Sequence, residues 1–110
     1  MATRRAILER VGHHVTLARD LRQVVAACEQ TEFDVVILGQ ALPAKEKQRV
    51  VHTVLEHCKL VRVLEYHDAL APDIPTVDAH LHVAGSTPQS LVECVNRLVA
   101  ELSREKQKEE

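Results

Sequence analysis

The segment Phe33-Asp34-Val35-Val36-Ile37-Leu38-Gly39 places four consecutive aliphatic residues between an aspartate and a glycine. An apolar run without alternating polar residues is typical of a strand covered on both faces, as in a parallel sheet. After this run Pro43 ends a turn, and residues 44–58 carry apolar side chains at helical spacing. The stretch therefore predicts one strand and one helix of a parallel α/β sheet.

The rest of the chain alternates in the same way. Gly12 is a helix-stop signal, Asp20 with Gln23 resembles a capping box, and Thr87 with Pro88 is typical of a helix start. We predict helices at 3–11, from Asp20 to about 28, at 44–58 and after Thr87, and strands at 14–18, 34–38, 60–64 and 79–83. Residues 65–78 are expected to form a loop. This order predicts an α/β fold with three layers and four parallel strands, with helices on both faces.

Composition limits the classes of function. The chain has 110 residues, 45% of them hydrophobic, and a formal net charge of -2, which indicates one globular domain and disfavours a strongly basic nucleic-acid binder. Aromatic residues make up 2%, too few for a base-stacking surface. The apolar runs are too short for a membrane span. We expect a cytoplasmic protein with a domain at residues 1–102, a charged tail at 103–110, and neither nucleic acid nor membrane as partner.

The three cysteines are Cys28, Cys58 and Cys94. They are odd in number and widely spaced, and each lies in an apolar run, which does not match the dense, paired cysteines of a disulfide-stabilised domain. We therefore predict three core thiols without a disulfide.

Several segments resemble the receiver domains of bacterial response regulators, which have a flavodoxin-like, doubly wound parallel sheet. The segment 33–43 resembles their third strand and the turn after it, 12–18 the exit of the first helix and the second strand, 77–81 the approach to the fifth strand, and 87–91 the start of the closing helix. The resemblance covers roughly residues 3–102. It implies a fold in which phosphorylation of an aspartate, assisted by a divalent cation, alters a surface that binds partner proteins.

The residues that carry this chemistry in the family are replaced here. Gly39 stands at the position of the phosphoacceptor aspartate, Glu65 at that of the hydroxyl residue after the fourth strand, and Val83 at that of the lysine after the fifth strand. A shift of one residue would place His82 at the lysine position instead. The first strand and its acidic pair are missing from the chain as given, and Asp34 lies at the wrong end of its strand to serve as nucleophile. We expect a degenerate receiver that does not accept phosphate.

Seven histidines raise the question of a metal site. His80 and His82 are two residues apart on a predicted strand and should share a face. No His or Cys pair has the spacing of a structural zinc site, so we expect neither metal nor cofactor.

Three classes of function remain open. The leading hypothesis is a non-enzymatic pseudo-receiver that binds signalling proteins, with a homodimer through an open sheet edge or the last helix as a further expectation. The alternatives are a small-ligand or enzyme domain that binds near Gly39 to Pro43, and a metal-responsive module built on His80 and His82. Without a first strand, we expect the strands at 14–18 and 34–38 to pair directly.

Overall fold

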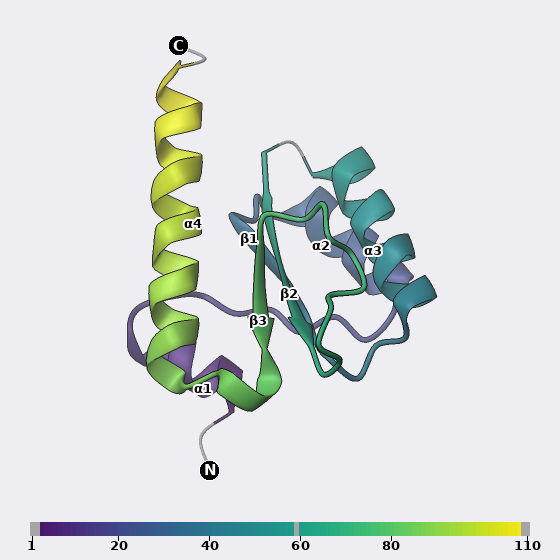
Figure 1. Ribbon diagram of the computed structural model, residues 1–110. Helices are drawn as coiled ribbons and strands as arrows, with labels where there is room; N and C mark the ends of the chain where they lie inside the picture. Colours follow the sequence, from purple (N-terminus) through teal and green to yellow (C-terminus); the bar gives the residue numbers. More distant parts are fainter. Residues whose placement is uncertain (1–2, 59, 109–110) are drawn as a thin grey trace.

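The computed structural model describes residues 3–58 and 60–108. Its secondary structure follows the order helix, helix, strand, helix, strand, strand, helix (Figure 1). The elements are α1 (Arg4–Arg10), α2 (Leu21–Gln30), β1 (Val35–Leu38), α3 (Ala44–His57), β2 (Arg62–His67), β3 (Ala79–His82), a single 3-10 turn (Val83–Gly85) and α4 (Pro88–Lys108).

The three strands described form one parallel sheet in the order β1-β2-β3. Leu38 at the end of β1 lies beside Glu65, and Glu65 lies beside His80 of β3. Because the strands are parallel, their carboxyl ends lie at one edge of the sheet, where α/β proteins usually place their functional residues.

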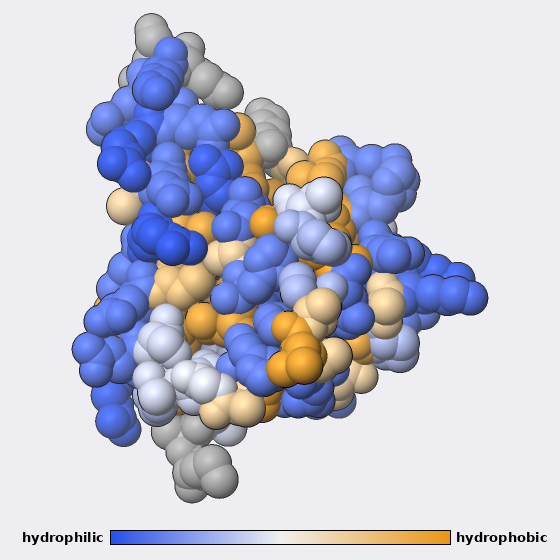
Figure 2. All heavy atoms as spheres, viewed as in Figure 1, coloured by the Kyte–Doolittle hydropathy of each residue, from blue (hydrophilic) through white to orange (hydrophobic). Residues whose placement is uncertain are grey.

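Helices cover both faces of the sheet. On one face α1 and α4 pack on Leu64, Tyr66 and Ala79, and on the other α3 and α2 pack on Leu38 and Val63. These two groups stand on opposite sides of the strands in Figure 1, and the outward side of α4 is hydrophilic in Figure 2. The arrangement confirms the predicted α/β class with a parallel sheet between two helical layers.

The helices begin where local chemistry predicts. The Asp20 side chain accepts a hydrogen bond from Gln23 N, and α2 starts at Leu21, directly after Asp20. The Thr87 side chain accepts a hydrogen bond from Ser90 N at the start of α4. Gly12 follows α1 with φ +98°, in the left-handed region where glycine carries no steric penalty. The side chains of Asp20 and Thr87 thus satisfy backbone N–H groups that the start of a helix leaves without a partner.

The predicted strand at 14–18 is wrong. The described residues between α1 and α2 contain no strand, and direct pairing with residues 34–38 does not occur. Val15 packs against the core, but Leu17 is 60% exposed. A short extended segment needs a neighbouring strand to bond its backbone, and none of the described strands lies beside it. The sheet therefore has three strands where four were predicted.

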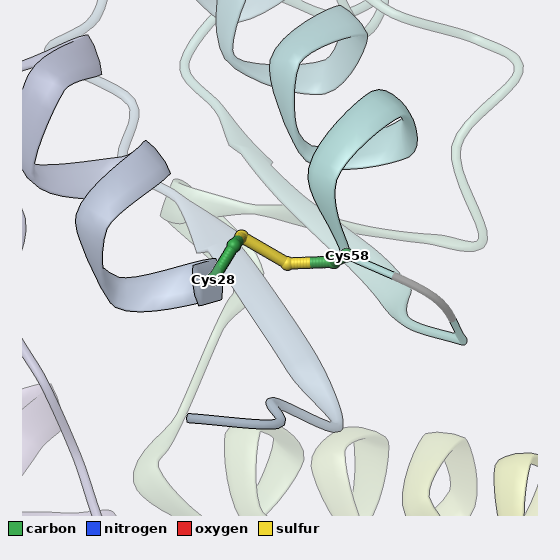
Figure 3. Close-up of a disulfide and its surroundings, with 2 residues drawn as sticks. All are labelled: Cys28 and Cys58. Atoms are coloured by element: carbon green, nitrogen blue, oxygen red, sulfur yellow. A yellow bond between two sulfur atoms is a disulfide. The ribbon is translucent and has the colours of Figure 1, made fainter. Parts of the chain in front are cut away.

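The predicted core thiols at Cys28 and Cys58 are also wrong. The two residues form a disulfide between the carboxyl-terminal ends of α2 and α3, with 5.3 Å between their Cα atoms (Figure 3). The fold brings together two helix ends that are separated by 30 residues in sequence, which residue spacing does not reveal. Cys94 is a half-buried free thiol on α4, and burial raises its pKa.

The expected boundary between the domain and a charged tail lies inside α4. This helix continues through Lys108 without a break, and Leu102 is 1% exposed. Beyond it, Glu105 lies 2.6 Å from the Arg62 guanidinium and Lys106 lies 3.4 Å from Asp34. These ion pairs hold the last turns of α4 near the amino ends of β1 and β2.

Candidate functional site at the carboxyl ends of the strands

The three positions singled out from the sequence lie at one edge of the sheet but not in one cluster. Gly39 follows β1, Glu65 lies inside β2 two residues before its end, and Val83 opens the 3-10 turn after β3. The Val83 side chain packs with the α1 and α4 layer. Glu65 instead contacts α3 and the loop between β2 and β3, so the structure does not bring Val83 into the cluster around Glu65.

The Glu65 side chain is completely buried, and its hydrogen bonds come from α3 and from the loop after β2. Its Oε2 accepts from Lys47 Nζ at 2.8 Å and from Asp73 N at 2.9 Å, and its Oε1 accepts from Ile74 N at 3.0 Å. His80 Nε2 lies 3.8 Å from Oε1. Such bonding is what a carboxylate needs to remain charged in an apolar interior.

Lys47 supplies the balancing positive charge from the start of α3. Its ammonium donates to Glu65, to the Tyr66 carbonyl at 2.9 Å and to Asp73 Oδ2 at 2.9 Å, and the residue is 1% exposed. These three acceptors match the three protons of the ammonium. We call the buried residues Lys47 and Glu65, together with Asp73, whose side chain is 37% exposed, the buried charge cluster.

The charges of Lys47 and Glu65 reinforce each other. Burial by itself would lower the pKa of Lys47, but the hydrogen bonds to Glu65 and Asp73 and the attraction of both carboxylates outweigh it and raise this pKa. Burial would likewise raise the pKa of Glu65, but the hydrogen bonds from Lys47, Ile74 N and Asp73 N lower it. Both groups are therefore held in their charged forms.

Three histidines fix the loop over this edge. His80 Nε2 donates to the Ile74 carbonyl, His82 Nε2 to the Asp68 carbonyl, and His67 Nδ1 to the Ala69 carbonyl, at distances from 2.7 to 3.0 Å. The rings of His67 and His82 stack with 5.1 Å between centroids, and His80 approaches His67 edge-on. The prediction that His80 and His82 share a strand face is confirmed.

Gly39 stands in open space beside this edge. Leu42 N donates to the Gly39 carbonyl, which closes the turn toward Pro43 and α3. A Cβ atom built on Gly39 would meet no atom within 4 Å. A side chain is therefore sterically allowed at Gly39, and packing does not require a glycine there.

Sequence reasoning missed Lys47 and Asp73. A signal for Lys47 was present, because it stands seven residues before Val54 and eleven before Cys58, at the helical spacing of the buried face of α3. The position of Asp73 beside Glu65 depends on the path of the loop, which residue spacing does not define.

The chemistry available at this edge is limited. Lys47 and Glu65 are both buried, and the carboxylate of Glu65 is already bonded by an ammonium and two backbone N–H groups. Within residues 3–58 and 60–108, no group of three or more His, Cys, Asp and Glu side chains is arranged to hold a metal ion. The arrangement serves to fasten the loop at 68–78 to β2 and α3.

Comparison with known proteins found no matching family, no matching curated protein and no matching solved structure. Among the helices described, none combines the length and the apolar character needed to cross a membrane.

Proposed function

We propose that the chain is a receiver-like domain of the flavodoxin-like, doubly wound class that has lost phosphoryl transfer and works as a protein-interaction module. The order of elements supports this proposal, with α1 and α4 on one face of the sheet and α2 and α3 on the other. In this proposal β1, β2 and β3 correspond to the third, fourth and fifth strands of the receiver family. The domain has no catalytic role, needs no cofactor and acts in the cytoplasm.

The observation that carries the proposal is the buried charge cluster. Phosphoryl transfer to an aspartate needs a carboxylate nucleophile, and a cation or fixed positive charge aimed at the phosphoryl oxygens. Here the nucleophile position is Gly39, and the neighbouring strand presents the anion Glu65. The ammonium of Lys47 points to Glu65, Asp73 and the Tyr66 carbonyl and has no proton left for a phosphate.

A fixed surface would replace the phosphorylation-dependent one. The loop at 68–78 joins β2 to β3 and is fastened by Glu65 and by three histidines. It presents Leu70, which is 94% exposed. A loop held by buried bonds can keep an apolar contact residue in place without a chemical signal, which is what a constitutive protein-binding surface needs.

The test is incubation of the protein with magnesium and a small acyl phosphate, followed by intact mass and by a two-dimensional amide NMR spectrum. We expect no phosphoryl adduct and no change in the amide positions of β2, β3 and the loop. A receiver domain with its aspartate, treated in parallel, provides the positive control. An adduct on this chain would overturn the proposal.

The variant Gly39→Asp sharpens the test. It places a carboxylate in open space, so it should fold like the parent, and we expect it to remain unphosphorylated because the ammonium of Lys47 is already bonded to Glu65 and Asp73. A phosphoryl adduct on Gly39→Asp would show that the nucleophile alone had been lost, and the role given to the buried charge cluster would be wrong.

A further inference from the structure

Helix α2 is attached to the molecule in an unusual way. All of its residues are described, none of them is buried, and it lies against α3. Val24 and Cys28 reach the core only as partly buried side chains at the edge of the cluster around Leu38 and Val54. By contrast, α1, α3 and α4 each bury at least one side chain. The disulfide from Cys28 to Cys58 adds a covalent attachment to this half-buried packing of α2 on α3.

We propose that the Cys28–Cys58 pair is a redox switch, a site for thiol–disulfide exchange with a dithiol reductant, that controls whether α2 stays docked on α3. In the oxidised form the bond holds the two helix ends together. In the reduced form only half-buried side chains, those of Leu21 and of residues 24–28, hold α2 against α3, and we expect α2 to undock more often. This inference does not depend on the proposed signalling function.

A reductant can approach the bond through a surface groove of about 640 Å³ at the amino ends of the strands. Both cysteines line this groove, together with Phe33, His57 and Lys106. Cys58 is 8% exposed and Cys28 is more exposed than that, so attack through the groove falls more readily on the Cys28 sulfur.

The exchange is balanced by a dithiol alone. One thiolate of the dithiol attacks the Cys28 sulfur, the bond between the two protein sulfurs breaks, and Cys58 leaves as a thiolate that takes up a proton. The second thiol of the reductant then attacks the mixed disulfide, which frees Cys28 and closes the reductant's own disulfide. Two electrons and two protons pass from the reductant to the protein.

Both cysteines stand at the carboxyl-terminal end of a helix. Cys28 lies in the last turn of α2, and Cys58 directly follows the last residue of α3. The carboxyl-terminal end of a helix carries partial negative charge and disfavours a thiolate, whereas a disulfide is neutral and meets no such penalty. A dithiol opens the pair, and an oxidised dithiol re-forms the bond by the reverse exchange, in which it accepts two electrons and two protons.

Opening the switch would change the surface of the domain. Without α2, the apolar side chains of Val36, Val50 and Val51 lose a neighbour at the edge of their cluster. The other face of the sheet, where α1 and α4 pack on Leu64 and Tyr66, has no contact with the disulfide. The change is therefore confined to the α2 and α3 side.

Amide hydrogen exchange on the full chain, with and without a dithiol, tests the proposal. Thiol counting should first give one free thiol in the oxidised protein, from Cys94, and three after reduction. On reduction we expect residues 21–30 to exchange at least about tenfold faster, with little change in α4 and β2. The variant Cys28→Ser should exchange like the reduced protein, and Cys94→Ser, the matched control, like the oxidised parent.

Three results would overturn the proposal. The first is three free thiols after treatment with an oxidised dithiol, which would mean that no disulfide forms. The second is unchanged exchange of α2 after reduction, which would mean that packing on α3 holds the helix. The third is loss of protection in α4 and β2 as well, which would make the bond a support of the whole fold and not a switch of α2.

Discussion

Lys47 and Glu65 are buried side chains of opposite charge, and each depends on the other. A buried ion pair often contributes little net stability relative to apolar residues, because both charges lose their hydration. Removal of one partner destabilises the folded protein, because the remaining charge stays buried without its counter-charge. The consequences fall on Asp73 as well, which keeps its place beside Glu65 through the same ammonium.

The substitution Lys47→Met therefore has a large expected effect. It retains much of the side-chain volume but leaves Glu65 uncompensated at 0% exposure, and we expect a loss of about 3–5 kcal/mol in the free energy of unfolding. Lys45→Met, at an exposed position of the same helix, should change it by no more than about 0.5 kcal/mol. Urea denaturation measures both.

A double variant identifies the cause of that loss. Lys47→Met combined with Glu65→Gln removes both charges, so it should be less destabilised than Lys47→Met alone. Equal destabilisation of the single and double variants would mean that lost packing, and not the uncompensated carboxylate, is responsible.

The same pair predicts how stability depends on pH. The pKa of Glu65 is lowered from 4.5 in the folded protein, so its contribution is complete above pH 4.5 and is lost as the pH falls through the folded pKa. The pKa of Lys47 is raised from 10.5, so its contribution is complete below pH 10.5 and is lost as the pH rises through the folded pKa. The stabilisation from the pair should be constant between these limits.

Urea unfolding at a series of pH values checks this expectation. Glu65→Gln should reduce the loss of stability on the acid side, because its amide does not titrate. An acid limb as steep in Glu65→Gln as in the parent would assign the pH dependence to other groups.

At the level of elements, the predictable parts of the fold are those whose chemistry is local. Asp20 and Thr87 mark helix starts because the backbone N–H groups that their side chains accept from lie three residues away. The apolar run at Val35 predicts a buried strand for the same reason. The segment at 14–18 has strand-like residues too, but a strand also needs a partner, and that depends on residues far away in sequence.

The candidate site also has parts that local sequence predicts and parts that depend on distant residues. The sequence predicted that Gly39, Glu65 and Val83 each stand at or just after the end of a strand. Gly39 and Val83 do, whereas Glu65 lies inside β2, which continues to His67 through residues predicted as loop. All three lie toward the carboxyl ends of their strands, because parallel strands align these ends. The sequence did not predict that the charge of Glu65 is balanced by hydrogen-bond partners, because these partners come from α3 and from a loop. The Cys28–Cys58 disulfide was missed for the same reason, since its geometry depends on how α2 lies on α3.

On the scale of the whole molecule, β1 leaves one edge of the sheet open within the part of the chain described. Arg62 N donates to the Asp34 carbonyl, and backbone groups of successive residues point to opposite sides of a strand. Val35 and Ile37 therefore direct their N–H and C=O groups away from β2, toward a side where no described strand lies. An apolar edge strand with free donors and acceptors favours pairing with another chain.

We therefore expect the protein to self-associate through β1, with a mass in analytical ultracentrifugation that rises with concentration above 12.3 kDa. Val35→Pro removes an outward N–H without removing a bond to β2, and prolines are tolerated at such edge positions. This variant should fold and remain monomeric. Leu55→Lys removes a leucine that is 65% exposed on α3, away from the edge, and should associate like the parent. A parent that is monomeric at every concentration would refute pairing through this edge. So would a loss of association in Leu55→Lys but not in Val35→Pro, because that result would assign association to exposed apolar area and not to the unpaired backbone of β1.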